Sequence, residues 1–323
     1  MFLRLVAIWQ ILMSQKKSTQ MSSIRDFLGH AYDLCALLAT GHIIYGIKRS
    51  TLRKAVLIIA KALREECLSP ADAAKVRGLL TWIDSGLAGR PCRGAMVALS
   101  ARQHGRAAAG HPLTPELRTA LQFFLLVLRV LPARAVPLLM DESPPVIIYS
   151  DAATLTSGLR LGAVIMELGG QAECVSVDVP EAVVERWELR TTYIGQGELI
   201  CGPLALHIWP DRLRGRRLLW FVDNTAAVSA IAKACSPTAD NSKMALILAL
   251  QAAAAGALIW VEYVNTAQNP ADPLSRGGLE DPVVLRRLAS GEWKAKRHSQ
   301  IEWEVLLNLN LEAAVDLVTT LGS

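Results

Sequence analysis

The sequence predicts an α/β protein in which a mixed β-sheet with helices against it follows a mainly helical region. Two observations predict this fold class. Before about residue 145, apolar residues recur at helical spacing, whereas beyond it short apolar runs rich in β-branched residues alternate with helical stretches. The length of 323 residues also suits one large domain or two of ordinary size.

The first part of the chain is expected to alternate helix, short strand and helix. Ser23 followed by Asp26 predicts the start of a helix over Ile24–Ala39. The apolar stretch Gly41–Gly46 fits a short strand. A helix follows over Ser50–Glu66, where apolar residues recur every three or four positions.

Two further helices of this half have clear start signals. Leu68-Ser-Pro-Ala-Asp begins a helix that extends to about Ser85, and Leu113-Thr-Pro-Glu begins one over Leu117–Leu131. In both, a hydroxyl residue can cap the helix and a proline occupies the first turn, where its missing N–H does no harm. The region before residue 145 is therefore predicted to be helical.

The two halves of the chain carry opposite charge. Residues 1–145 have 19 Lys and Arg against 9 Asp and Glu, a net charge of +10, and residues 146–323 have a net charge of −5. This asymmetry favours one part that holds a polyanion and one that binds cations, although solvated charged surfaces give the same totals. The basic residues that could contact a phosphate backbone are Lys48, Arg49, Arg53, Lys54, Arg90, Arg93, Arg102, His104 and Arg106.

The second half is predicted to contain five strands, the first three joined by Gly-bearing turns as an antiparallel meander. The strands are Val146–Ser150, Leu161–Leu168, Glu173–Val177, Arg216–Val222 and Leu258–Val264. The helices predicted there are Glu198–Trp209, Thr225–Ala234, residues 237–255 and residues 269–276. Asn224 can cap the second of these, whereas Gly202-Pro203 should kink the first or delay its start.

Four carboxylates lie at the ends of these predicted elements. Asp151 and Asp223 each follow an apolar strand, and the carboxyl ends of neighbouring strands meet at one edge of an open sheet. Glu198 begins a helix, and Asp272 stands between two prolines. Each acid alone has an ordinary structural explanation as a turn residue, a helix cap or a solvated side chain. Their shared placement predicts instead that the four meet in space.

A cluster of carboxylates calls for a cation, because the charges repel and would otherwise favour protonation. Hard oxygen ligands without Cys or His select Mg²⁺, with Mn²⁺ as a substitute. Two such ions about 3.5–4 Å apart can hold the attacking water and the leaving oxygen of a phosphodiester. The four acids, Asp151, Glu198, Asp223 and Asp272, are therefore the predicted metal ligands and catalytic residues.

Five motifs of the second half occur in a characteristic order. They are Tyr-Ser-Asp-Ala, Gly-Ala-Val-Ile, Glu-Leu, Val-Asp-Asn-Thr-Ala-Ala-Val and Asn-Pro-Ala-Asp-Pro-Leu-Ser-Arg. In this order they resemble the ribonuclease H domain of retroelement reverse transcriptases, over about Pro145–Gly278. The earlier Leu-Ser-Pro-Ala-Asp and Leu-Thr-Pro-Glu segments are similar to the connection region that precedes this domain in such elements.

The resemblance implies a fold and a domain organisation. The fold is a ribonuclease H-like mixed five-stranded sheet in the order 3-2-1-4-5, flanked by helices and preceded by a mainly helical region. The segments are residues 1–22, a disordered or artefactual N-terminal segment; residues 23–144, a helical connection-like basic region; residues 145–278, the ribonuclease H-like domain; and residues 279–323, a C-terminal helical tail.

The resemblance also implies an activity, hydrolysis of the RNA strand of RNA–DNA hybrids with two Mg²⁺ ions. Asp151 would bridge both ions, Glu198 and Asp223 would complete one, and Asp272 the other. The predicted nucleic-acid contacts are Asn224, Thr225, Arg276, Arg90, Arg93, Arg102 and Arg106. The polymerase portion of a larger polyprotein is a further implied partner.

The sequence departs from the family pattern in three respects. The basic substrate-binding insertions are lacking between Asp223 and Leu258, where Lys233 and Lys243 stand nearly alone, so binding of a hybrid is expected to depend on the basic first half. The paired-aspartate motif of the polymerase, Tyr-x-Asp-Asp, does not occur, so the chain should not polymerise nucleic acid. Cellular relatives carry a His before the last Asp, and Glu262–Asn269 contains none. Three other interpretations stay open: a non-catalytic nucleic-acid-binding remnant, a metal-free structural protein whose acids are turn residues, and a transposase or integrase, which would need a late Glu where the last acid is Asp272.

Composition favours an intracellular protein of the cytoplasm or nucleus. No run of about 18 uncharged apolar residues occurs, so no membrane span is expected. The 6 cysteines are widely spaced without a CxxC pair, which favours buried reduced thiols over a zinc site or disulfides.

Overall fold

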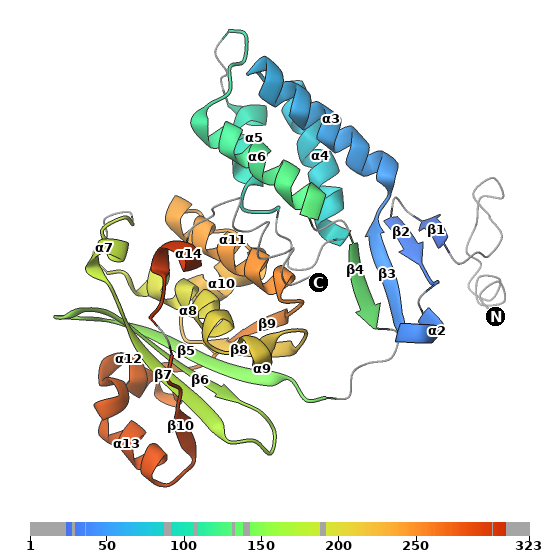
Figure 1. Ribbon diagram of the computed structural model, residues 1–323. Coiled ribbons are helices and arrows are strands. Elements are labelled where there is room, and N and C mark those ends of the chain that lie inside the picture. Colours follow the sequence, from blue (N-terminus) through green and yellow to red (C-terminus); the bar gives the residue numbers. More distant parts are fainter. Residues whose placement is uncertain are drawn as a thin grey trace.

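The computed structural model describes residues 24–27, 30–35, 37–86, 92–105, 109–130, 133–137, 143–187, 192–298 and 300–307. Two β-sheets organise these residues, one of four strands and one of six (Figure 1). Helices α3 to α6 accompany the first sheet, and the remaining larger helices accompany the second (Figure 1).

The first sheet has the order β1-β2-β3-β4 and is antiparallel throughout. Its strands are β1 (Ile24–Phe27), β2 (His30–Asp33), β3 (His42–Ile47) and β4 (Ala133–Pro137), with the short helix α2 (Leu37–Thr40) before β3. The helix expected over Ile24–Ala39 is therefore wrong, whereas the strand expected over Gly41–Gly46 is confirmed. A four-residue segment is too short to show a period of its own, so the conformation of β1 and β2 depends on the pairing of β1 with β2 and of β2 with β3.

The helices of the first half are α3 (Arg49–Glu65), α4 (Pro70–Gly86), α5 (Met96–His104) and α6 (Pro115–Val130). The predicted helix starts are confirmed by their caps. The Ser69 hydroxyl accepts a hydrogen bond from the backbone N–H of Asp72 at 3.1 Å, and Thr114 accepts one from Leu117 at 3.3 Å. These helices share one apolar core, with Ile59, Leu80 and Phe124 fully buried.

The second sheet is mixed and has the order β10-β7-β6-β5-β8-β9. Its strands are β5 (Val146–Leu155), β6 (Gly158–Met166), β7 (Ala172–Val179), β8 (Arg217–Val222), β9 (Leu258–Tyr263) and β10 (Trp293–Ala295). Strands β5, β6 and β7 form the antiparallel meander, while β8, β9 and β10 each pair parallel to a neighbour. The sheet is a mixed α/β arrangement compatible with a ribonuclease H-like fold.

The predicted count of five strands is wrong, because β10 pairs with β7 as a sixth. This strand has only three residues and comes from the region assigned to the C-terminal tail. Trp293, its first residue, is fully buried beneath the sheet with Leu274 and Val284. Because so short a strand is defined by the side chain it buries and the neighbour it pairs with, local sequence does not reveal it.

Helices lie on both faces of this sheet. One face is covered by α8 (Ile194–Ile208), α9 (Pro210–Leu213), α10 (Thr225–Lys233) and α11 (Ala239–Ala254), and the other by α12 (Asp272–Arg276) and α13 (Pro282–Ala289) (Figure 1). The shorter elements are α7 (Glu181–Val184), α14 (Trp303–Leu307) and the 3₁₀ turns Thr266–Gln268 and Gly278–Glu280. None of the helices in the described part of the chain has the length and apolar character that crossing a bilayer requires.

Helix α8 differs from its prediction. It begins at Ile194, ahead of Glu198, and continues through Pro203 to Ile208. Pro203 lacks the N–H that an interior helical residue donates, and so weakens the helix locally. Every residue from Gln196 to Ala205 is buried, however, and this packing outweighs the missing hydrogen bond.

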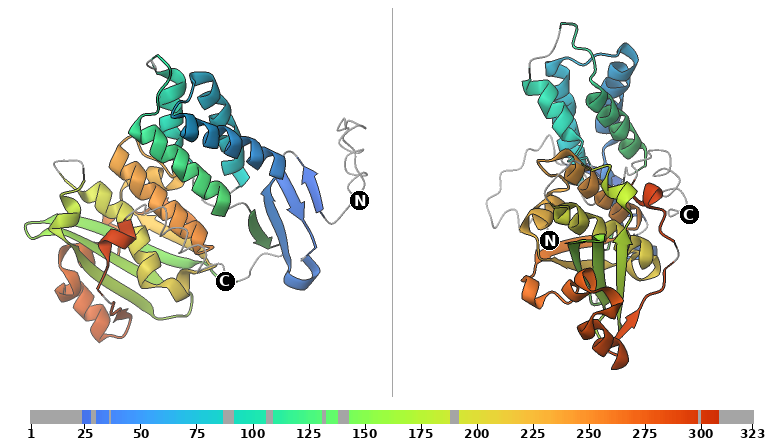
Figure 2. Two further views of the ribbon diagram at one scale, coloured as in Figure 1. Left: turned by 45° about the horizontal axis from the view of Figure 1, so that its top comes forward. Right: turned by 90° about the vertical axis from the view of Figure 1, so that its left-hand side faces the viewer.

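Helix α11 joins the two parts of the molecule. It lies between the six-stranded sheet and helices α3 to α6, as the turned views in Figure 2 also show. Leu248 faces the core of the sheet, whereas Leu246 belongs to the core of the first-half helices. Gly94, which precedes α5, lies close to the end of α10, because a Cβ added to it would lie 3.2 Å from the carbonyl oxygen of Ala234.

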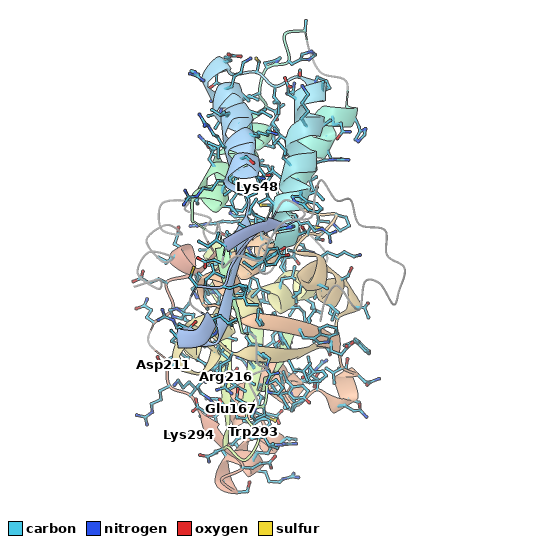
Figure 3. The ribbon with its side chains drawn as sticks, turned by 90° about the vertical axis from the view of Figure 1, so that its right-hand side faces the viewer. Lys48, Glu167, Asp211, Arg216, Trp293 and Lys294 are labelled. Carbon is cyan, nitrogen blue, oxygen red and sulfur yellow. The ribbon has the colours of Figure 1, made fainter. Side chains whose placement is uncertain are left out.

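Ion pairs hold the end of the sheet opposite the four predicted ligands. Arg212 lies 3.0 Å from Glu167 and 3.3 Å from Glu173, whose other oxygen accepts the indole N–H of Trp209. Arg216 lies beside Glu167, while Lys48 marks the start of the distant helix α3 (Figure 3). This network fixes the end of β6 and β7 against α9.

Candidate metal centre

Three of the predicted ligands meet at one edge of the six-stranded sheet. Carboxylate oxygens of Asp151, Glu198 and Asp223 lie within 4.8 Å of one another. Asp151 and Glu198 are buried, being 4% and 1% exposed, and Asp223 is half-buried. Three acids from β5, α8 and the residue after β8 therefore share one small volume.

The register of β5 and β8 brings two of these acids together. The parallel pairing ends with Ser150 opposite Val222, so Asp151 and Asp223 are the next residues on adjacent strands. The expectation that the first strand stops before Asp151 is wrong, because β5 continues to Leu155 along β6. The site therefore lies at the C-terminal end of β8 and beside the middle of β5, and not at the end of β5.

The third acid reaches the cluster because α8 packs very closely on β5. A Cβ on Gly197 would lie 2.6 Å from the Cβ of Ala152, closer than such atoms approach. Only glycine allows the helix to come this near, and Glu198 is the next residue. The buried Oε2 of Glu198 has no hydrogen-bond partner among the described residues. An unpaired buried carboxylate oxygen is costly and favours a ligand.

Helix α12 is fastened against β5 and β6 on the opposite face. Gly162, which pairs with Asp151, lies under it, and a Cβ there would lie 2.7 Å from the Ala271 carbonyl oxygen and the Ser275 nitrogen. The Asn269 amide donates to the Ser150 carbonyl at 2.9 Å. The Ser275 hydroxyl donates to Oδ2 of Asp151.

Asp272 lies beside the three acids but is not part of the group with oxygens within 4.8 Å. Its Oδ1 accepts from Nε of Arg276 at 2.8 Å, one helical turn away. Its charge still acts on the cluster, because it contributes to raising the pKa of Asp151. The structure thus brings three predicted ligands together and places the fourth next to them in an ion pair.

Burial and mutual repulsion make the cluster reluctant to ionise. Burial first, and then the charges of Asp151 and Asp223, raise the pKa of Glu198 to about 10. Burial is also the main cause that raises the pKa of Asp151 to about 6, while the Ser275 hydrogen bond acts in the other direction. A bound cation would reverse this balance, and an all-oxygen set suits Mg²⁺ or Mn²⁺. The residues therefore fit a hard divalent ion, whose identity this donor set does not fix further.

The residues predicted to contact nucleic acid have different environments. Asn224 caps α10, its Oδ1 accepting from the N–H groups of Ala226 and Ala227, and Thr225 begins that helix. Arg276 is 63% exposed within its ion pair. It is the last residue of α12, one helical turn after Asp272.

The arginines of the first half differ in accessibility. Arg93 is exposed, whereas Arg102 is 9% exposed and its guanidinium donates to the carbonyl of Pro112. Arg102 therefore fastens the loop before α6, a placement that does not favour its predicted phosphate contact. Arg90 and Arg106 lie outside the described residues.

Four residues that build the centre were not among the predicted site residues, and one of them, Gly162, was expected in a turn but lies within β6. They are Gly162, Gly197, Asn269 and Ser275. Asn269 and Ser275 stand in the same Asn-Pro-Ala-Asp-Pro-Leu-Ser-Arg motif that supplied Asp272, so the motif contained the signal. The role of Gly162 depends on which helix crosses it, which no local pattern specifies. Comparison of the chain with protein-family models and with curated proteins finds no match, so the geometry of the centre carries the functional argument.

Proposed function

We propose that the protein is a Mg²⁺-dependent hydrolase that cleaves the RNA strand of RNA–DNA hybrids. In this proposal its sheet is a ribonuclease H-like domain of a retroelement-type reverse transcriptase without the polymerase site. The observation that carries the proposal is the group of Asp151, Glu198 and Asp223, with oxygens within 4.8 Å and one buried oxygen of Glu198 unpaired. Buried acids with strongly raised pKa values are typical of functional sites.

The chain's own residues would hold and orient the reacting groups. Asp151, Glu198 and Asp223 would hold the cation, and Asp272, whose charge acts on Asp151, would add a fourth carboxylate. When bound, Mg²⁺ supplies a Lewis acid that lowers the pKa of a bound water and neutralises charge on the phosphate. The hydrogen bonds from Asn269 to the Ser150 carbonyl and from Ser275 to Asp151 hold the segment that carries Asp272 against β5.

The distribution of charge supports a nucleic-acid substrate. The first half of the chain carries a net charge of +10 and could hold a polyanion that an acidic centre alone would repel. The choice of an RNA–DNA hybrid rests on the order of the motifs that resemble the ribonuclease H domain.

Cleavage of labelled duplexes tests the proposal. We expect the RNA strand of an RNA–DNA hybrid to be cut in Mg²⁺ and not in EDTA, with DNA duplexes left intact. Asp151→Asn should lower the rate by about a thousandfold or more, because charge stabilisation at such a site is worth several kcal/mol. Asp211→Asn, an exposed acid on α9 (Figure 3), is the matched control and should cleave like the wild type. Full activity of the Asp151 variant would contradict the proposal.

A second candidate is a nucleic-acid-binding protein without turnover. The observation that favours it is the Arg276–Asp272 ion pair, which leaves only three acids in the group. Hybrid binding that weakens steeply with salt, without cleavage at any Mg²⁺ or Mn²⁺ concentration, would favour this candidate.

A further inference from the structure

The fourth acid of the proposed centre already has a cation as its partner. Asp272 Oδ1 accepts from Nε of Arg276 at 2.8 Å, and the two residues are one turn apart on α12. The Asp272 side chain is 24% exposed, so it is accessible to an ion from solvent. Arg276 thus places a positive charge beside the carboxylate that a second metal ion would need as a ligand.

The same helix also engages the first acid. The Ser275 hydroxyl donates to Oδ2 of Asp151 and lies 2.9 Å from the backbone carbonyl of Asp272. On the side that faces α12, one oxygen of Asp151 therefore has a hydrogen-bond partner. Glu198 differs, because its buried Oε2 has none among the described residues. The three-acid group thus has an unpaired carboxylate oxygen that a cation could bind. The oxygens of Asp151 and Asp272 that interact with α12 residues already have a hydrogen-bond or ion-pair partner.

We propose that Arg276 and a second divalent ion compete for Asp272. In this inference, which rests on the proposed metal centre, Asp151, Glu198 and Asp223 bind a first ion tightly. A second, weaker ion binds only when Arg276 leaves Asp272. Arg276 is then a positioning residue that sets how many ions the centre holds at a given concentration.

The energetics allow this exchange. Exposed ion pairs between residues four apart on a helix contribute little to stability. The Arg276 side chain is 63% exposed, so it can turn into solvent without opening the core. A guanidinium close to the carboxylate also repels an arriving divalent ion. Removing the guanidinium should therefore increase the binding affinity of the second ion more than that of the first.

Calorimetric titration of the full chain with Mg²⁺ alone, and electron paramagnetic resonance of free Mn²⁺, measure this directly without any substrate. We expect the wild type to show one tight and one weaker ion. Arg276→Gln should tighten the weaker ion by about fivefold or more at low salt, with a smaller change at the tight one. Arg286→Gln, which removes a charge from an exposed position on the neighbouring helix α13, should change both constants by less than about twofold.

A double-variant cycle isolates the competition. Asp272→Asn should lose the weaker ion, and adding Arg276→Gln to it should restore nothing, because the shared ligand is gone. Equal gains at both ions in Arg276→Gln, or identical constants in Arg276→Gln and the wild type, would overturn the inference and leave the metal centre standing. Absence of any ion binding to the wild type would overturn the proposed metal centre and this inference together. Thermal unfolding of each variant checks that the exposed substitutions leave the fold intact.

Discussion

The acids at the edge of the second sheet reduce the stability of the protein that contains them. Asp151 and Glu198 are 4% and 1% exposed and lie within reach of a third carboxylate. Burial of a charge without a compensating partner is unfavourable, and residues that impose such a cost commonly serve function. Substitutions at these positions should therefore raise the stability of the metal-free protein while they weaken metal binding.

Asp151→Asn should make the metal-free protein more stable. The pKa of Asp151 is raised from 3.8 to about 6 by burial, so its ionised form costs up to about 3 kcal/mol of unfolding free energy at pH 8. The neutral amide removes this cost. Urea unfolding in EDTA should show the gain, and added Mg²⁺ should no longer stabilise the variant. Asp211→Asn is the control and should change neither quantity by more than about 0.5 kcal/mol. A loss of more than about 1 kcal/mol in the Asp151 variant would contradict the prediction.

The stability of the metal-free protein should fall as pH rises. Both acids have folded-state pKa values above their ordinary values of 3.8 and 4.5, so the folded chain binds more protons than the unfolded chain. The free energy of unfolding then decreases with pH, through about 6 for Asp151 and on towards about 10 for Glu198. This contribution is fully present below the ordinary pKa values and is lost above the raised ones.

Urea unfolding in EDTA across about pH 5–9 measures this slope. Glu198→Gln should flatten it, because the amide stays neutral throughout. Saturating Mg²⁺ should reverse it, since the ion binds the ionised acids and releases their protons. A metal-free stability that rises with pH over the same range would show that the acids are not buried together.

At the scale of elements, the position of α12 depends on the absence of a side chain at Gly162. A Cβ there would lie 2.7 Å from the Ala271 carbonyl oxygen and the Leu274 Cβ, so Gly162→Ala must displace the helix. We expect a loss of about 1–3 kcal/mol and weaker Mg²⁺ binding, because α12 carries Ser275 and Asp272. Urea unfolding and calorimetry measure the two effects.

Gly78→Ala is the matched control for this prediction. Gly78 lies within α4, and a Cβ there would meet nothing within 4 Å. The substitution should raise stability by about 0.5–1 kcal/mol, because alanine favours the helix, and should leave Mg²⁺ binding unchanged. Equal effects of the two substitutions would show that α12 does not pack closely on β6.

The elements that were predictable from sequence are those with strong local signals. Helices α4 and α10 have capping residues, Ser69 and Asn224, whose side chains accept the expected backbone hydrogen bonds. Strands β5 and β8 begin as apolar runs, and their parallel pairing up to Ser150 and Val222 brings the next residues, Asp151 and Asp223, together. In these cases the local pattern and the tertiary structure agree.

The elements that were missed depend on partners far away in sequence. Strands β1 and β2 have four residues each; β1 pairs with β2, β2 pairs with β3, and β3 in turn pairs with β4. Strand β10 exists because Trp293 fills the core beneath β7. Ser275 could be predicted to cap or to face solvent, but its bond to Asp151 depends on how α12 crosses the sheet. Such contacts are properties of the folded molecule and leave no local period.

At the scale of the whole molecule, an acidic centre is combined with a basic region. The first 145 residues carry a net charge of +10, against −5 for the remainder. Helix α3 presents Arg49, Arg53, Lys54, Lys61 and Arg64 as exposed basic residues. Since an acidic centre alone would repel nucleic acid, the proposed binding of an RNA–DNA hybrid is expected to depend on this helix.

Replacing Arg53 and Lys54 together by Gln should weaken hybrid binding and make it less sensitive to salt. Each phosphate that a basic residue neutralises contributes about 0.9 to the slope of log affinity against log salt concentration for a duplex. If both residues contact phosphates, the slope should fall by about 1.8 in magnitude. Fluorescence anisotropy with a labelled RNA–DNA duplex in EDTA, over a series of salt concentrations, measures the slope without cleavage.

Arg286→Gln combined with Lys294→Gln is the control for charge alone. Both residues are exposed, on α13 and β10 at the far side of the second sheet, where Lys294 lies well away from Lys48 at the start of α3 (Figure 3). This pair removes the same net charge from the chain as the α3 pair. Because counterion release counts only phosphates in contact, the control should retain the wild-type slope. Equal reductions by both pairs would show that net charge, and not the surface of α3, governs binding, and an unchanged slope in the α3 variant would place the duplex elsewhere on the protein.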